Sequence, residues 1–181
     1  EGDNWIVKTN NSTTFSTPNV IIAGGVGSFE PRKFPVKECE KFENKSVLYS
    51  IRDKKIFEGK TVTIFGGGDS ALDWAVELSK KSKVNLVHRR DDFRGAQATV
   101  DKMHEFVKDG KINLFTKYQM SSIKGERQLE SIDIKHDDKQ IKTLKTDYAL
   151  GFFGLIMQLG PIANWGLNVN KKTIEVDTEK F

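Results

Sequence analysis

The spacing of the apolar residues changes twice in the middle of the chain. Residues 61–65 form a short apolar and β-branched run, which is typical of a strand buried in a parallel sheet. Between residues 71 and 78 the apolar residues recur every three or four positions, on one face of a helix, and lysines follow where the helix dipole favours cations. Residues 84–88, which read Val-Asn-Leu-Val-His, predict a second strand. The pattern predicts a strand, a helix and a second strand in succession.

The chain beyond this unit continues the alternation. Residues 97–108 carry an apolar face at helical spacing, and residues 112–115 predict a third strand. Alternating stretches around residue 123 and within residues 129–144 then predict an antiparallel meander, and an apolar strand follows at 149–154. We therefore predict an α/β fold, a Rossmann-like domain in which the meander covers one face of a small parallel sheet.

The start of the chain has the features of a different unit. Residues 5–9 and 13–16 predict a hairpin, and residues 19–23 predict a buried strand. The glycine-rich residues that come next imitate a phosphate loop. Pro31 and Pro35 prevent the helix that such a loop requires, so we interpret this segment as a crossover loop.

Residues 36–59 are polar and charged and have no clear hydrophobic period. They predict loops with one short strand at 47–49. The one cysteine of the chain, Cys39, falls in this segment, and we expect an unremarkable thiol in a charged loop. A single cysteine excludes an internal disulfide, a C-x-x-C motif and a zinc cluster built from this chain.

The residues between the first strand and the first helix fit the dinucleotide fingerprint G-x-G-x-x-G/A. They read Gly66-Gly67-Gly68-Asp69-Ser70-Ala71. In this pattern Gly66 permits a tight turn, Gly68 lets a pyrophosphate approach the backbone, and a small residue at position 71 lets the helix pack closely on the strand. The free N–H groups of the helix then face the phosphates.

Asp69 and Ser70 start this helix and are candidates for capping it. For Ser70, capping and a position near the pyrophosphate are compatible. Asp69 would repel a phosphate unless its side chain is turned away.

The second strand ends where an NAD-binding site places an acid for the ribose 2′-hydroxyl. This chain has Arg89 and Arg90 there, and Arg94 follows. Guanidinium groups make charge-assisted, bidentate hydrogen bonds to a 2′-phosphate. The predicted ligand is therefore NADP, with His88 lining its adenosine site.

Composition narrows the class of protein further. The formal net charge is +4 and the acids are scattered among the basic residues, so nucleic-acid binding is not indicated, although docking of an acidic protein is compatible. No run approaches the ~20 apolar residues of a membrane span, and no signal peptide is visible at the N-terminus, so we expect a cytoplasmic protein. No histidine has a carboxylate or nucleophile positioned beside it by the sequence, so no catalytic side chain and no metal site are assigned.

GGGDSALDWAVELS at 66–79 and HRRDDFRGAQATVDKM at 88–103 resemble the NADP-binding domain of the thioredoxin-reductase-like flavoproteins, most closely the ferredoxin–NADP reductases of that type. The resemblance extends to residues 21–35 and 153–170. It implies that the glycine turn holds the pyrophosphate and that the three arginines hold the 2′-phosphate. It also implies that Gly154 lies near the nicotinamide.

From the resemblance we expect residues 1–30 to end a first segment of an FAD domain, residues 31–154 to form the NADP domain, and residues 155–181 to begin the return to the FAD domain. The expected full-length protein is a homodimeric, FAD-containing reductase with ferredoxin or flavodoxin as its partner, and this fragment alone is expected to be inactive. A thioredoxin-reductase-like oxidoreductase and a stand-alone NADP-binding sensor remain the alternatives. Dithiol exchange requires a second thiol that this chain lacks.

Overall fold

The computed structural model describes residues 4–25, 27, 30–156, 158–171 and 173–179. Its internal contacts divide the chain into two units. The smaller unit combines residues 1–30 with residues 157–181, and the larger unit is the continuous segment 31–156. The chain therefore leaves the smaller unit once, forms the whole larger unit, and returns.

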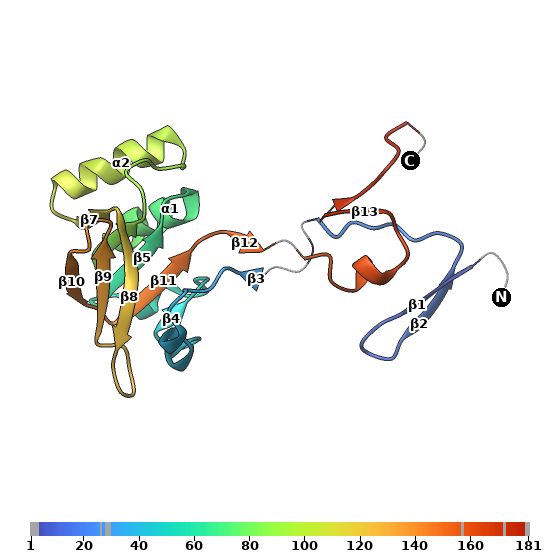
Figure 1. Ribbon diagram of the computed structural model, residues 1–181, viewed down its shortest axis with the longest axis horizontal. Coiled ribbons are helices and arrows are strands. Elements are labelled where there is room, and N and C mark those ends of the chain that lie inside the picture. The colour runs from blue at the N-terminus through green and yellow to red at the C-terminus, as the bar shows by residue number, and fades with distance from the viewer. Residues whose placement is uncertain (1–3, 26, 28–29, 157, 172, 180–181) are drawn as a thin grey trace. The chain divides into compact units, whose positions relative to one another are not determined.

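The larger unit is built on a five-stranded parallel sheet with the strand order β4-β11-β5-β6-β7. The strands are β4 (Val47–Leu48), β5 (Thr61–Gly66), β6 (Lys83–His88), β7 (Ile112–Thr116) and β11 (Tyr148–Phe152). Helix α1 (Asp69–Leu78) connects β5 to β6, and helix α2 (Gln97–Lys108) connects β6 to β7. This confirms the alternation of strands and helices that the apolar spacing predicts (Figure 1).

The two faces of the sheet belong to two separate hydrophobic clusters. Ile64 and Leu86, which are register partners on β5 and β6, pack with the apolar faces of α1 and α2. Phe65 and Val87, each one residue further on, point to the opposite face and pack with the meander. Side chains of a strand alternate between faces, so the adjacent apolar residues Ile64-Phe65 and Leu86-Val87 serve both layers.

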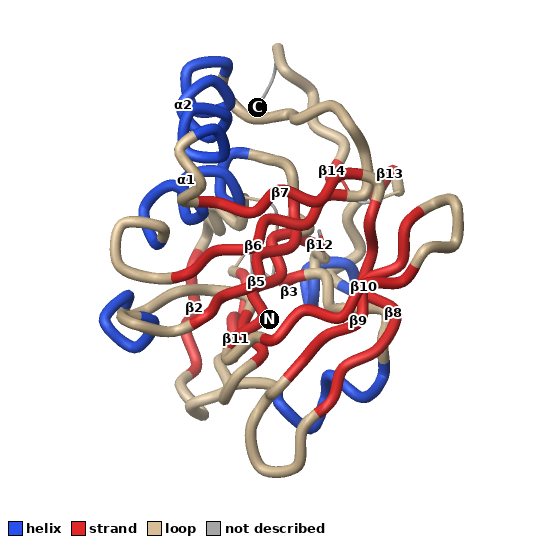
Figure 2. The backbone as a smooth tube through the Cα atoms, turned by 90° about the vertical axis from the view of Figure 1, so that its left-hand side faces the viewer, coloured by secondary structure: helices blue, strands red, loops and turns tan. Residues whose placement is uncertain are grey.

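The meander consists of β8 (Tyr118–Lys124), β9 (Ser131–His136) and β10 (Ile141–Lys145), paired antiparallel in the order β10-β9-β8 (Figure 2). Its buried residues Ile132 and Ile134 pack toward the sheet. Asp133, between them, faces the other way and binds both neighbouring strands through Lys124 (2.8 Å) and Ser122 (2.7 Å) on β8 and through Thr143 on β10. The predicted meander is confirmed.

The polar segment 36–59 is more ordered than predicted. It contains the 3-10 helices η1 (Lys37–Phe42) and η2 (Lys54–Phe57), with β4 between them. The expectation of a thiol in a charged loop is wrong, because Cys39 lies on η1 and is only 1% exposed. Phe42 and Phe57 are buried as well. A few apolar residues anchor this segment, too sparsely spaced to produce a hydrophobic period.

The smaller unit has short elements: strands β1 (Trp5–Lys8), β2 (Thr14–Thr17), β13 (Val169–Asn170) and β14 (Thr173–Ile174), and the 3-10 helix η3 (Gly160–Asn164). β1 and β2 form the predicted hairpin. A separate two-stranded pair, β3 (Glu30–Pro31) with β12 (Leu155–Ile156), is formed where the chain enters and leaves the larger unit.

The predicted buried strand at residues 19–23 is wrong. These residues form no strand, and the Ile21 side chain is 91% exposed. A strand needs a neighbouring strand for its backbone hydrogen bonds, and no described residue of this chain pairs with this stretch. The described residues between 24 and 35 contain no helix, as Pro31 and Pro35 predict, whereas residues 26, 28 and 29 lie outside the described part.

Candidate functional site

The turn from β5 into α1 brings three elements unusually close together. Gly66 has a φ of 153°, and a Cβ added to it would lie 2.7 Å from the Phe152 carbonyl oxygen on β11 and 2.8 Å from the Ala71 Cβ on α1. Ala71 itself is fully buried. A glycine at position 66 and a small residue at 71 therefore allow the helix to start directly at the strand end, as the fingerprint predicts.

The middle residue of the glycine turn, Gly67, has no room for a side chain because a residue of the next strand lies against it. A Cβ at Gly67 would lie 2.2 Å from Cε1 of His88, the last residue of β6. The His88 ring stacks on Phe93 at 5.1 Å, and its Nε2 donates to the Asp92 carbonyl oxygen at 3.0 Å. Burial of the ring lowers the pKa of His88, so the imidazole is neutral at pH 7. His88 is thus a packed support for the turn.

Gly68 is open where its neighbours are crowded. Apart from Gly68 and its two chain neighbours, no atom of the described residues lies within 4 Å of the position of an added Cβ. Gly68 is also the N-cap residue of α1. Its carbonyl oxygen accepts the Ala71 N–H at 3.0 Å, whereas the N–H groups of Asp69 and Ser70, at the first two positions of the helix, have no acceptor among the described residues. A free backbone surface and free N–H groups at one place are suited to an anion.

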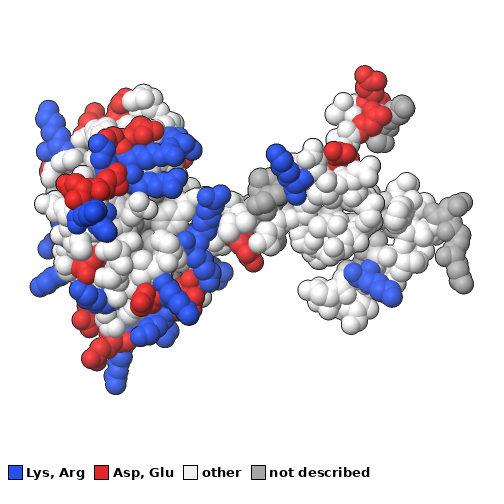
Figure 3. Space-filling view, viewed as in Figure 1, with Lys and Arg blue, Asp and Glu red and all other residues white. Residues whose placement is uncertain are grey.

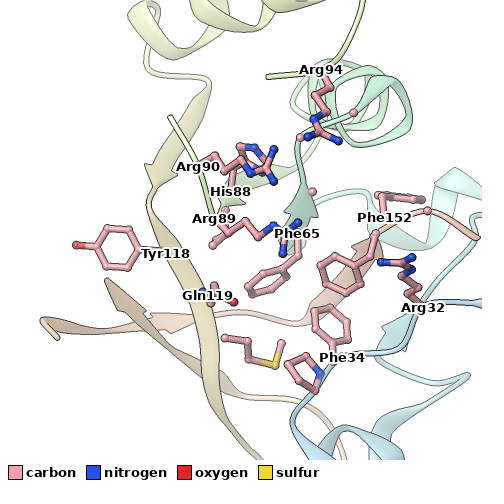
Figure 4. Close-up of a pocket in the computed structure, with 18 of the residues that line it drawn as sticks. Arg32, Phe34, Phe65, His88, Arg89, Arg90, Arg94, Tyr118, Gln119 and Phe152 are labelled. Carbon is pink, nitrogen blue, oxygen red and sulfur yellow. The ribbon is translucent and has the colours of Figure 1, made fainter. Parts of the chain in front are cut away.

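The segment after β6, residues 89–96, is here termed the arginine loop. Arg89 and Arg90 continue β6, and the Arg94 backbone N–H donates to the Gly67 carbonyl oxygen at 2.8 Å. The three arginines, which are labelled in Figure 4, line one cavity together with the glycine turn, residues 66–68. Across the described residues none of the three makes an ion pair or a side-chain hydrogen bond. Three cations without an ion-pair partner in the described ranges, next to the start of α1, are suited to an anion.

A cavity of about 490 Å³ covers this turn. It collects most of the residues singled out from the sequence: Gly66, Gly67, Gly68, His88, Arg89, Arg90, Arg94 and Gly154. Among the described lining residues there is no aspartate or glutamate. Elsewhere on the larger unit, acidic and basic side chains are mixed over the face shown in Figure 3. The excess of positive charge is therefore a local property of the cavity.

Asp69 and Ser70, also predicted for the site, do not line the cavity. The Asp69 carboxylate is turned toward the arginine loop, where Oδ1 accepts the Ala96 backbone N–H at 2.7 Å. Ser70 is exposed at the start of α1. Of the two sequence-based options for Asp69, the structure has the one in which the carboxylate turns away from the glycine turn.

The cavity also contains residues that the sequence did not point to. Arg32 lies beside Phe152, on the opposite side of the cavity from Tyr118 (Figure 4). The Arg32 backbone N–H donates to the Gly154 carbonyl oxygen at 3.1 Å, and its guanidinium has no partner in the described part of the chain. Gln119 enters from β8. Arg32 follows Pro31 in a segment interpreted only as a crossover loop. Gln119 is one of several polar positions in an alternating strand. Nothing in the sequence therefore indicated that either residue lines the cavity.

No cluster of residues suited to a metal ion occurs in the described ranges. None of the described helices combines the length and the apolar character that crossing a membrane requires.

The model of the family described as pyridine nucleotide-disulphide oxidoreductase matches residues 1–181. The chain belongs to this family. Its curated relatives include a ferredoxin–NADP reductase from Pelagibacter ubique (strain HTCC1062), which is 67% identical over 177 residues, covering 98% of this chain and 52% of the relative. Ferredoxin–NADP reductase 1 of Christiangramia forsetii is 49% identical, over 98% of this chain and 51% of the relative. The chain thus spans about half the length of these family members.

Solved structures agree with the fold. Thioredoxin reductase from T. acidophilum matches with a TM-score of 0.83 at 23% identity, covering 98% of this chain and 58% of that one. Thioredoxin reductase from Lactococcus lactis matches with a TM-score of 0.80, also at 23% identity, with the same coverage. At this identity the likeness establishes the shared fold of the family and leaves the reaction to the residues of the site.

Proposed function

We propose that this chain is the NADP(H)-binding part of a flavoprotein reductase that transfers electrons between NADPH, FAD and a one-electron carrier protein, ferredoxin or flavodoxin. The observation that carries the proposal is the cavity over the glycine turn: among the residues that the structure describes, it is lined by four arginines without a side-chain partner and by no carboxylate. Gly66, Gly67, Gly68 and the start of α1 would hold the pyrophosphate, and Arg89, Arg90 and Arg94 the 2′-phosphate.

The preference for NADP over NAD follows from the end of β6. A site for NAD needs a carboxylate that accepts the ribose 2′-hydroxyl. The two acids nearest in sequence do not supply it, because Asp91 is bound to the Lys117 ammonium at 2.6 Å and Asp92 does not line the cavity. Arg89 and Arg90 would instead meet the charge of a 2′-phosphate.

The nature of the acceptor is supported by the similar ferredoxin–NADP reductases and by the state of the single cysteine. Burial raises the pKa of the Cys39 thiol to about 12, with smaller contributions from Glu43 and Glu38. Its Sγ contacts the Met120 Sδ at 3.4 Å. A buried, protonated thiol with no second cysteine in this chain is not suited to disulfide exchange with thioredoxin.

FAD, which the proposal places in the longer protein, accepts a hydride and passes electrons on singly. We assign residues 31–154 to the NADP domain, and residues 1–30 and 155–181 to pieces of the FAD domain. The smaller unit supports this assignment because it joins both ends of the chain yet leaves Trp5 (61%) and Ile6 (55%) largely exposed. Exposed apolar side chains of this kind would be covered by the remainder of such a domain. A cytoplasmic homodimer remains part of the same proposal.

The cavity residues would bind and orient. Hydride transfer belongs to the two cofactors, and no side chain of this chain is assigned to acid-base or covalent chemistry. His88, the one histidine among the described residues that line the cavity, is neutral and donates its ring N–H to a backbone carbonyl, which suits a supporting role.

The test is the affinity of the protein for 2′,5′-ADP and for 5′-AMP, measured by titration calorimetry. The Arg89→Ala/Arg90→Ala variant should lose roughly 1.5 to 3 kcal/mol per charged hydrogen bond toward 2′,5′-ADP and almost nothing toward 5′-AMP. Arg127→Ala is the matched control, because Arg127 lines a different cavity. Equal losses for both ligands would refute the 2′-phosphate site.

A stand-alone NADP-binding sensor is the proposal's competitor. The two differ in redox chemistry: the reductase, as the full-length protein, should contain FAD that NADPH bleaches, whereas a sensor binds NADP without a flavin signal. An absorbance spectrum before and after NADPH addition separates them.

A further inference from the structure

The arginine loop is joined to the glycine turn and to α1 by three contacts. The Arg94 N–H donates to the Gly67 carbonyl oxygen at 2.8 Å, and the Ala96 N–H donates to Asp69 Oδ1 at 2.7 Å. Between them Gly95 approaches α1 so closely that an added Cβ would lie 2.6 Å from Leu72 Cδ1. The loop that carries the arginines is therefore seated on the elements that would hold the pyrophosphate.

Asp69 supplies the charged side-chain bond among these three contacts. The Arg94 bond joins two backbone groups, and the Gly95 contact is a close approach without a side chain. Elsewhere the loop is held by the stack of Phe93 on His88 and by the ion pair of Asp91 with Lys117, both located before Arg94. The segment from Arg94 to the start of α2 depends on Asp69 for its charged anchor.

The position of Asp69 creates two effects of opposite sign. Through space, a carboxylate at the start of α1 disfavours a phosphate bound at the glycine turn. Through its bond to Ala96, it holds Arg94 near that phosphate. The second effect also places the carboxylate at the N-terminal end of α2, where negative charge is favourable. Removing the side chain distinguishes the two effects, because they predict opposite changes in affinity.

We propose that Asp69 is a positioning residue for nucleotide selectivity: by binding the Ala96 N–H it holds the arginine loop in the geometry that receives a 2′-phosphate. The inference rests on the proposed function, since it deepens the role of the same site. Asp69 contacts no ligand in this account and acts through Arg94 and its neighbours.

The experiment measures the ratio of affinities for 2′,5′-ADP and 5′-AMP, so that losses common to both ligands cancel. Asp69→Ala should lower this ratio about tenfold, because it removes the charged hydrogen bond that positions the arginine loop. Asp69→Asn removes the charge but keeps an acceptor for the Ala96 N–H, so its ratio should stay at or above that of the native protein. Asp73→Ala is the matched control, because Asp73 lies one turn further along α1 and makes no bond to the loop.

A second variant breaks the same bond from the other side. Ala96 has a φ of −55°, which proline adopts without strain, so Ala96→Pro removes the N–H donor while leaving every charge in place. It should lower the ratio as Asp69→Ala does. If Asp69→Ala fails to fold, as judged by thermal unfolding, the Ala96→Pro and Asp69→Asn pair still decides the question.

A coupling test shows whether Asp69 acts through the arginines. In the Arg89→Ala/Arg90→Ala/Arg94→Ala background, adding Asp69→Ala should leave the ratio unchanged, because no guanidinium remains to be positioned. A further fall of the ratio in that background would overturn the inference.

The remaining outcomes separate the inference from the function on which it rests. A native protein that prefers 2′,5′-ADP, with arginine variants that lose the preference and an Asp69→Ala variant that keeps or strengthens it, overturns the inference alone. A native protein without any preference overturns the proposed function, and this inference with it.

Discussion

The imidazole of His88 occupies the space that any side chain at Gly67 would need. An added Cβ would lie 2.2 Å from Cε1 and 2.4 Å from both ring nitrogens. The ring is itself held by its stack on Phe93 and by its bond to the Asp92 carbonyl oxygen. It cannot withdraw without breaking those contacts, so the middle glycine of the motif is required by packing.

Gly67→Ala should therefore destabilise the protein by about 1–3 kcal/mol, the usual cost of overpacking a well-filled site. It should also weaken nucleotide binding, because the turn must shift. The free energy of unfolding from urea titration and the affinity for 5′-AMP measure the two effects. The control variant Gly68→Ala changes the neighbouring, open position of the same turn and should destabilise the protein less.

The double variant Gly67→Ala/His88→Ala identifies the cause. Removing the ring opens the space that the new methyl group needs, so the double variant should be more stable than the sum of the single changes predicts. Strictly additive losses would show that the strain at position 67 has another origin.

The reason for this glycine illustrates what the sequence could predict. The roles of Gly66 and Ala71 follow from a local motif, and local spacing also predicts the strands and helices around it. The requirement at Gly67 comes from His88 at the end of a neighbouring strand, and the seat of the arginine loop comes from Asp69 binding Ala96. Contacts between segments distant in sequence leave no local pattern.

Arg32 extends the positive lining to the other side of the cavity, beside Gly154, which the family resemblance places near the nicotinamide. A ligand that fills both sides should meet Arg32, and one that ends at the 5′-phosphate should not. We expect Arg32→Ala to weaken NADP⁺ about tenfold and to leave 2′,5′-ADP within about twofold of the native value. Arg127→Ala serves as the control, and equal losses for NADP⁺ and 2′,5′-ADP would place Arg32 at the adenosine side instead.

The predictions that failed have one physical cause in common. Residues 19–23 are apolar enough for a buried strand, but a strand forms only beside a partner, and no described residue pairs with them. Residues 36–59 look like loops, yet Cys39, Phe42 and Phe57 reach the core from short 3-10 helices. Burial at these places is decided by the surroundings of the segment and not by its own periodicity.

Cys39 predicts a loss of stability at alkaline pH. Burial raises its pKa from 9.0 to about 12 in the folded protein, so above pH 9 the unfolded chain releases a proton that the folded chain retains. Below pH 9 the buried thiol makes its full contribution to the free energy of unfolding. That contribution is lost as the pH rises through about 12, and the free energy of unfolding falls by no more than about 1.4 kcal/mol per pH unit.

The pKa of Tyr49 is also raised to about 12, so this residue too lowers the stability of the folded protein over part of the same pH range. The measurement is therefore the difference in the free energy of unfolding between the native protein and Cys39→Ala, at about pH 8 and about pH 10. As the pH rises, the native protein should lose more free energy of unfolding than the Cys39→Ala variant does. A pH-independent difference would mean that the thiol ionises equally in both states and is not buried as described.

The state of Cys39 leads to a prediction about the acceptor of the proposed full-length reductase. Thioredoxin reduction requires an enzyme thiolate to attack the substrate disulfide and a second thiol to resolve the mixed disulfide. Cys39 is 1% exposed, is kept protonated by burial, and contacts Met120. We expect NADPH-dependent reduction of ferredoxin or flavodoxin, unchanged within about twofold in Cys39→Ala, because electrons pass from a flavin to the carrier without a cysteine.

The native protein and the variant should be assayed against ferredoxin, flavodoxin and thioredoxin under one set of conditions. Turnover of thioredoxin that disappears in Cys39→Ala would contradict this reading, because it would require the thiol to become exposed and ionised during the reaction.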